Sequence, residues 1–100
     1  MTTVGDVVLK VRSKNAGPFW LTIDVFCETA EAYERIVVGL STDRVAAALK
    51  TEVAEIKRFN IADLNVVKFS LPRPQIQGDI ADRDMHGAGW APLIAELSLN

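Results

Sequence analysis

The run from Arg12 to Phe19 holds the side chains of this sequence best suited to binding a negatively charged group. It reads Arg-Ser-Lys-Asn-Ala-Gly-Pro-Phe and lies between two segments that alternate like β-strands. The guanidinium suits a carboxylate or phosphate, the ammonium adds a mobile charge, and the hydroxyl and carboxamide add neutral donors. The glycine permits positive φ angles with which backbone amides can surround an anion. We therefore expect a binding connection where a plain hairpin would need only a short turn.

Two further observations bear on this expectation. Alternation along the first strand places Arg12 and Lys14 on the same side. Arg73 lies between Pro72 and Pro74 directly after another strand pattern, so its backbone is stiff and it is a third candidate cation. The alternative interpretation is a solvated turn whose cations pair with nearby acids. The expected ligand-binding residues are Arg12, Ser13, Lys14, Asn15, Gly17 and Arg73.

A second group of residues that could bind a metal or take part in catalysis consists of Asp82, Asp84 and His86. They occupy alternate positions, so an extended backbone would project all three to one side. Such a group could hold a divalent metal, and Asp84 with His86 could act as a catalytic acid-base pair. The alternative is a polar surface loop in which the two aspartates flank Arg83. We expect no metal and no cofactor.

Cys27 is the only cysteine, which excludes an internal disulfide and a multi-cysteine zinc site. It follows an apolar strand pattern, and the chain has a single histidine that could activate it. We expect a buried structural thiol.

Composition limits the class of protein. The 100 residues are 49% hydrophobic and 24% charged, which predicts one compact domain over residues 1–100. The net charge is −2 and the basic residues are scattered along the chain, which argues against binding of nucleic acid. The first residues lack the features of a signal peptide, and no stretch approaches the length of a membrane span. We expect a cytoplasmic protein without membrane contact.

Hydrophobic periodicity predicts the elements that position these residues. A period of two indicates strands at Asp6–Arg12, Phe19–Phe26, Ile56–Asn60, Asn65–Leu71 and Leu93–Leu99. The third of these is ambiguous, because Val53 and Ile56 could equally extend a preceding helix. From Pro72 to Pro92 no period holds, which is typical of a functional or disordered loop.

Two helices are expected between the strand pairs. Thr29 is a suitable N-cap for the first, which should end near Gly39 in the left-handed position that glycine favours. Ser41 or Thr42 can cap the second, whose buried stripe would be Val45, Ala48 and Leu49. This order predicts a two-layer α+β sandwich, with a mainly antiparallel sheet of four to five strands and two helices on one face.

Several short motifs also resemble a known family. They are Arg12 to Phe19, Leu21-Thr22-x-Asp24, Tyr33-Glu34-Arg35, Arg73-Pro74, Asp82-Arg83-Asp84, Gly87-Ala88 and Ala91-Pro92-Leu93. In these motifs the chain resembles, nearly end to end, the small bacterial domain of unknown function that accompanies AtuA-type (acyclic terpene utilisation) proteins. It is more distantly similar to the ferredoxin-like C-terminal domain of AtuA-type chains, which has an Arg-Ser-Gly-Asp-Lys-Gly turn in place of the run from Arg12 to Gly17.

The resemblance implies a ferredoxin-like fold and a partnership with a larger AtuA-like chain in carboxylic-acid or acyl-thioester catabolism. The sequence departs from the family after Ala88, where Gly89 and Trp90 replace an expected Gln-Gln-His-like run. A catalytic role that depends on that run is therefore in doubt, and His86 is the only imidazole.

Three hypotheses for function follow. The first is a small subunit that binds an anionic metabolite, of the carboxylate or acyl-CoA type, with Arg12, Lys14, Asn15 and Arg73 at an interface with the larger chain. The second is a stand-alone lyase or isomerase that uses Asp84 and His86. The third is a structural homo-oligomer without a small ligand, assembled through the outer face of the second strand.

Overall fold

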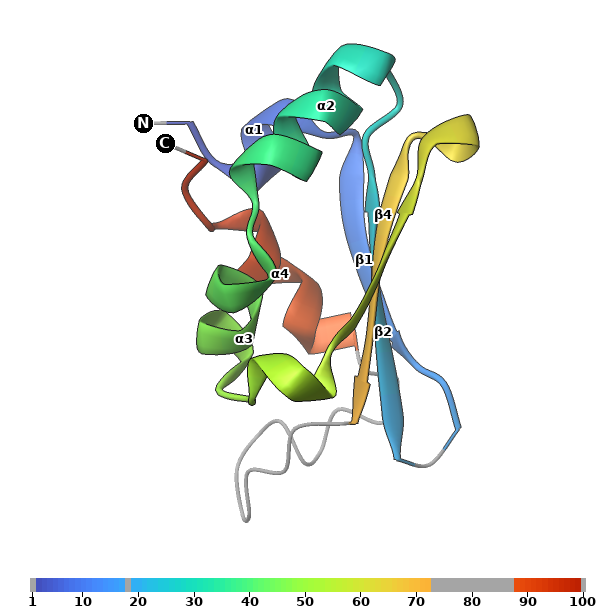
Figure 1. Cartoon of the computed structure of the whole chain (residues 1–100), viewed down its shortest axis with the longest axis vertical. Coiled ribbons are helices and arrows are strands. Elements are labelled where there is room, and N and C mark those ends of the chain that lie inside the picture. The colour runs from blue at the N-terminus through green and yellow to red at the C-terminus, as the bar shows by residue number, and fades with distance from the viewer. Residues whose placement is uncertain (1, 18, 73–87, 100) are drawn as a thin grey trace.

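The computed structural model describes residues 2–17, 19–72 and 88–99, and an antiparallel sheet forms one of its two layers (Figure 1). Its four strands, in the order β1-β2-β4-β3, form two hairpins that meet where β2 pairs with β4. The strands are β1 (Lys10–Asn15), β2 (Trp20–Phe26), β3 (Lys57–Ile61) and β4 (Val66–Pro72). The strands expected near residues 19–26, 56–60 and 65–71 are thus confirmed within one residue at either end.

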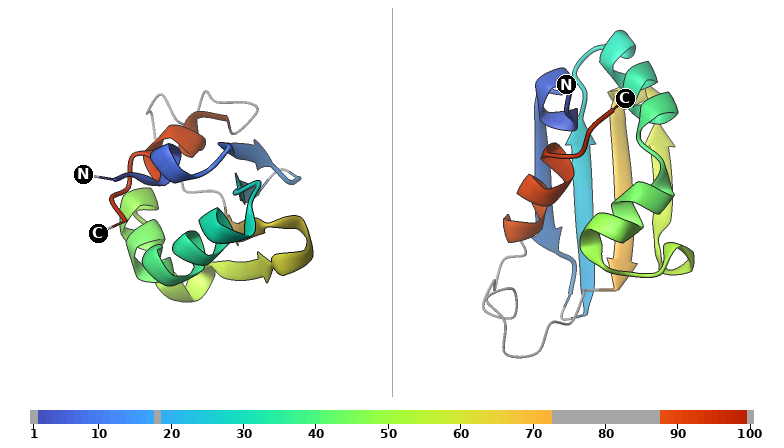
Figure 2. Two further views of the ribbon diagram at one scale, coloured as in Figure 1. Left: turned by 90° about the horizontal axis from the view of Figure 1, so that it is seen from above. Right: turned by 90° about the vertical axis from the view of Figure 1, so that its left-hand side faces the viewer.

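The helices lie together on one face of this sheet (Figure 2). They are α1 (Val4–Val7), α2 (Ala30–Gly39), α3 (Thr42–Leu49) and α4 (Ala91–Ala95), with short 3-10 turns η1 (Val53–Glu55), η2 (Ala62–Leu64) and η4 (Ala88–Trp90) in the connections. The expected α+β sandwich is confirmed, with four helices on the covered face where two were expected. The ferredoxin-like classification stays a prediction.

The hydrophobic core lies between the helices and the sheet. The central strands supply six side chains with no exposed surface, namely Leu21, Ile23, Val25, Val67, Phe69 and Leu71. The helices supply Val4, Ile36, Val45, Leu49 and Ile94, which are also almost completely buried. Burial of this apolar surface is the main force that holds the two layers together.

Side-chain caps define the starts of α2 and α3. The Thr29 hydroxyl accepts a hydrogen bond from the Ala32 N–H at 3.1 Å, and the Ser41 hydroxyl accepts one from the Arg44 N–H at 3.3 Å. Both helices therefore begin where the sequence predicted. Gly39 is the last helical residue, and the expected left-handed position after the helix is wrong. A Cβ atom at Gly39 would lie 3.4 Å from the Leu99 carbonyl oxygen, in van der Waals contact, so the C-terminal segment packs directly against this residue.

The first predicted strand begins later than expected, because α1 replaces its start. Thr3 and Asp6 form a capping box, in which the Asp6 carboxylate accepts from the Thr3 N–H at 3.0 Å and the Thr3 hydroxyl accepts from the Asp6 N–H at 3.3 Å. Val4 in this short helix is completely buried, whereas Leu9, which lies between the helix and the strand, is 61% exposed. The strand then runs from Lys10 to Asn15.

The strand predicted over Leu93–Leu99 is wrong, because Ala91–Ala95 forms α4. Pro92 lies in the first turn of this helix, where its missing N–H has no helical partner to lose. After the helix, an isolated bridge joins Ser98 to Thr3, and the Leu99 N–H donates to the Thr2 carbonyl at 2.9 Å. This bridge brings the two ends of the described chain side by side (Figure 1).

Candidate functional site

The connection between β1 and β2 is shorter than the sequence suggested. Asn15 still pairs with Leu21 in the strand ladder, and the Ala16 N–H donates to the Trp20 carbonyl at 2.8 Å. Gly17 takes a φ of 80° in the remaining turn, as expected. The expectation that the connection begins at Arg12 is therefore wrong, since the residues from Arg12 to Asn15 belong to a regular strand, whereas their binding role stays a prediction.

This strand divides the expected ligand-binding residues between two faces of the sheet. Ser13 is 3% exposed on the helix-covered side, where its hydroxyl accepts a hydrogen bond from the Ala91 N–H at 2.9 Å. Asn15 lies on the same side and is half-buried. Arg12 and Lys14 are exposed on the opposite side. Ser13 therefore stabilises the packing of α4, and only the two cations face outward together.

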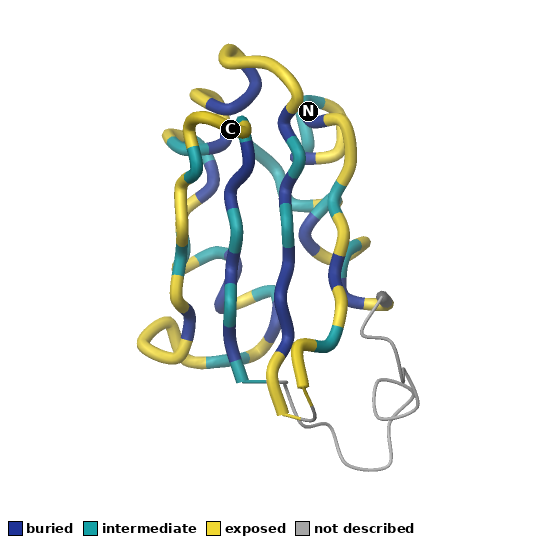
Figure 3. The backbone as a smooth tube through the Cα atoms, turned by 90° about the vertical axis from the view of Figure 1, so that its right-hand side faces the viewer, coloured by how far each residue is buried: buried dark blue, intermediate teal, exposed yellow. Residues whose placement is uncertain are grey.

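We call the side of the sheet that no described helix covers the open face (Figure 3). Strand register places five cations and one carboxylate on it, namely Lys10, Arg12, Lys14, Lys57, Lys68 and Asp24. These groups are scattered in the sequence and converge only because the two hairpins pair. The period-two alternation of each strand was the available signal, but it does not reveal which strands are neighbours.

Cross-strand pairing arranges this face in rows. One row consists of Lys14, Thr22, Ser70 and Lys57, one residue from each strand. The adjacent row consists of Arg12, Asp24, Lys68 and Phe59. In the second row Asp24 offsets part of the positive charge beside it, whereas the first row has two ammonium groups, two hydroxyls and no acid. We call the first row the polar row.

Thr22 is the most unusual residue of the polar row. It is only 6% exposed, although it lies on the open face. Within the described parts of the chain its hydroxyl oxygen has no hydrogen-bond partner. A buried hydroxyl without a partner lowers stability, so such groups are uncommon in native proteins.

Aromatic contacts show how two of the lysines lie. The Lys57 Nζ is 5.9 Å from the centroid of the Trp20 ring, so these two side chains meet across β4, at the end of the sheet where β2 begins. The Lys10 Nζ is 5.2 Å from the centroid of the Phe26 ring, at the other end of the open face. Among the described residues, no carboxylate forms an ion pair with Arg12, Lys14 or Lys68. The interpretation of Arg12 and Lys14 as cations paired with nearby acids thus finds no support there.

Arg58 is a cation of a different kind, on the covered face of β3. Its guanidinium donates to the Leu40 carbonyl at 2.6 Å, the Thr42 hydroxyl at 3.3 Å and the Asn60 carboxamide oxygen at 3.0 Å. Burial lowers the pKa of Arg58 from its ordinary value. This residue caps the last turn of α2 and connects the helices to the sheet.

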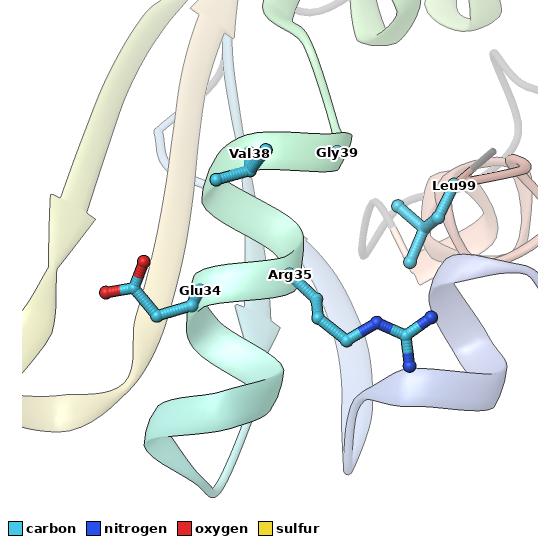
Figure 4. A pocket seen from close by; sticks show the side chains of 5 residues that line it. All are labelled: Glu34, Arg35, Val38, Gly39 and Leu99. Carbon is cyan, nitrogen blue, oxygen red and sulfur yellow. The ribbon is translucent and has the colours of Figure 1, made fainter.

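A shallow hollow lies between α2 and the C-terminal segment (Figure 4). Its lining consists of Glu34, Arg35, Val38, Gly39 and Leu99, which includes none of the expected ligand-binding residues. The side chains of Glu34 and Arg35 point in different directions, so they do not converge on a common point (Figure 4). The hollow is therefore a weaker candidate than the open face.

Cys27 is a buried structural thiol, as expected. It is 2% exposed, its sulfur lies 3.7 Å from the Val25 carbonyl oxygen, and burial raises its pKa to about 11. A thiol with a raised pKa carries little thiolate at neutral pH and is a poor nucleophile.

The remaining expectations concern residues that the structure does not describe. Arg73, Asp82, Asp84 and His86 lie outside the described residues, so their roles stay predictions. In the described ranges, no cluster of three or more His, Cys, Asp or Glu side chains could hold a metal ion. In those same ranges no helix has the length and apolarity to cross a membrane.

Comparison with known proteins gives a family. No curated protein and no solved structure matches the chain. A family model described as a domain of unknown function (DUF4387) matches residues 4–96. The match confirms the resemblance to a small domain of unknown function, whereas the association with AtuA-type proteins stays a prediction. Because the match covers nearly the whole sequence, the chain belongs to the DUF4387 family.

Proposed function

We propose that this protein is an accessory domain that binds an anionic group of a metabolite, a carboxylate or an acyl-CoA-type ligand, on the open face of its sheet. The observation that carries the proposal is the pair Arg12 and Lys14, which lie exposed on one side of β1. Both cations are free of ion pairs with the described residues. A guanidinium beside an ammonium is a good receptor for a carboxylate or a phosphate.

The chemistry of this face favours binding over bond cleavage. Its described residues offer cations and the hydroxyls of Thr22 and Ser70, which hold an anion by charge and hydrogen bonds. Among them is no imidazole or thiol that would serve as a base or a nucleophile. This set of cations and hydroxyls suits a small subunit that positions a ligand for another chain.

We propose further that the other chain is a larger AtuA-like protein and that the ligand belongs to carboxylic-acid catabolism. The resemblance of the sequence to the AtuA-associated domain supports this partner. Trp20 and Phe59, which are 42% and 47% exposed on the open face, support a surface that another protein contacts.

Thermal unfolding with and without anions tests the proposal. Succinate, citrate or an acyl-CoA should raise the Tm of the wild-type protein, because a ligand at about 100 times its Kd adds about 2.7 kcal/mol to the unfolding free energy. Arg12→Ala should abolish the rise. Arg35→Ala, which removes an exposed cation from α2, is the matched control and should retain it. The absence of a shift with every anion, in the presence of the larger chain as well, would contradict the proposal.

A further inference from the structure

We infer that the ligand carries at least two negative groups and lies across all four strands, along the polar row from Lys14 to Lys57. This inference rests on the proposed function and names the class of ligand, a polycarboxylate or a polyphosphate. It adds Thr22, Ser70 and Lys57 to the cations of β1.

The spacing of the row indicates an extended ligand. Lys14 and Lys57 lie on the two edge strands, and neighbouring strands are about 4.8 Å apart, so their Cα atoms are separated by about 14 Å. The Lys57 Nζ lies 5.9 Å from the centroid of the Trp20 ring, which belongs to the next row of the open face. The two lysines therefore stand at opposite ends of the row. A single carboxylate would contact one end, whereas a ligand with separated anionic groups would contact both.

Thr22 supplies an independent observation. Its hydroxyl lies between Lys14 and Ser70 in the row, is buried, and has no hydrogen-bond partner among the described residues. Lys14 is the cross-strand neighbour of Thr22. A shift of the exposed side chains around Thr22 would let an oxygen of the ligand accept the missing hydrogen bond. A satisfied hydroxyl in the bound state would account for a polar group that destabilises the free protein.

The charge of the open face argues against a second copy of the same face as its occupant. Five cations and one carboxylate leave an excess of positive charge there, although the whole chain has a net charge of −2. Two open faces brought together would place like charges opposite one another. A bound polyanion would instead neutralise the cations of the open face. Its negative groups are best accommodated at the polar row, which contains no acidic residue.

Isothermal titration calorimetry at low salt tests the inference with three probes: acetate, citrate and coenzyme A. Citrate represents the polycarboxylates and coenzyme A represents the polyphosphates. The probe with the higher affinity therefore shows which of the two classes of ligand the row binds. The tighter probe should bind at least about tenfold more strongly than acetate, because charge-assisted contacts form at both ends of the row. Lys57→Ala should remove most of this gain and leave the affinity for acetate unchanged.

Two further variants and one control variant complete the test. Thr22→Val preserves the shape of the side chain and should weaken the polyanion several-fold without lowering the Tm. Asp24→Asn removes a negative charge beside the row and should tighten binding, an effect of opposite sign that misfolding cannot imitate. Lys10→Ala, which removes a cation held near the Phe26 ring on the same strand and face, is the matched control and should change the affinity less than about twofold.

The outcomes separate the two proposals. The inference is overturned and the proposed function stands if citrate, coenzyme A and acetate bind with equal affinity, if Arg12→Ala abolishes that binding, and if Lys57→Ala and Thr22→Val leave the affinities unchanged. If no probe binds to the protein alone or in the presence of the larger chain, both are overturned. If a short single-stranded oligonucleotide binds more tightly than citrate and coenzyme A, the open face is a nucleic-acid surface and the inference is overturned.

Discussion

The two faces of the sheet use the same four strands in opposite ways. On the covered face, the apolar side chains of β2 and β4 are fully buried, and the cation Arg58 donates its hydrogen bonds to neighbouring carbonyl and side-chain oxygens. On the open face, Arg12 and Lys14 have no ion pair with the described residues, and the buried hydroxyl of Thr22 has no partner among them. The covered face therefore contributes to stability, and the open face holds groups whose presence folding does not explain.

The largest expected difference between the faces is in two phenylalanines on adjacent strands. Phe69 is fully buried on the covered face, so Phe69→Ala should lower the unfolding free energy by about 3 to 5 kcal/mol. Phe59 is 47% exposed on the open face, so Phe59→Ala should cost less than about 1 kcal/mol. Urea unfolding followed by circular dichroism measures both. Equal losses would show that the open face is buried in the protein as it exists in solution.

A smaller difference is expected between two arginines. Arg58→Ala removes a guanidinium whose hydrogen bonds satisfy the end of α2, and should lower the unfolding free energy by about 2 kcal/mol. Arg12→Ala, the matched control on the open face, should change it by less than about 0.5 kcal/mol. The same urea titrations decide this pair. A large loss for Arg12→Ala would mean that this cation supports the fold, which would remove the basis of the proposed site.

The smallest expected effect is the titration of Cys27 at the end of β2. Burial raises its pKa to about 11 from 9.0, so the unfolded state releases the thiol proton at lower pH than the folded state. The stability contribution is complete below pH 9 and is lost as the pH rises toward 11. Between about pH 8 and pH 10 the loss should be about 1 kcal/mol. Cys27→Ala, as control, should lack this slope, and an identical pH profile in both proteins would refute the buried thiol as its source.

Local patterns predicted the elements whose signals are strong and consistent. The alternation of β2 and β4 and the caps of α2 and α3 depend on a few neighbouring residues, and those predictions were confirmed. At the two ends of the chain the predictions failed in part: the first strand begins at Lys10 instead of Asp6, and α4 occupies the start of the predicted last strand. Leu93, Leu97 and Leu99 alternate as in a strand, but a short apolar run does not distinguish a strand from a buried helical turn. In the structure both ends form short helices, α1 and α4, which bury Val4 and Ile94 in the core.

For the candidate site, the sequence by itself determined that Arg12 and Lys14 share one side of a strand, because side chains alternate with a period of two. The same alternation puts Ser13 and Asn15 on the other side, so a cluster of all four was excluded once the strand extended to Asn15. Only the tertiary structure decided that Lys57 and Ser70 complete a row with Lys14. Strand order and register depend on how the two hairpins pack against the helices, which no local pattern encodes.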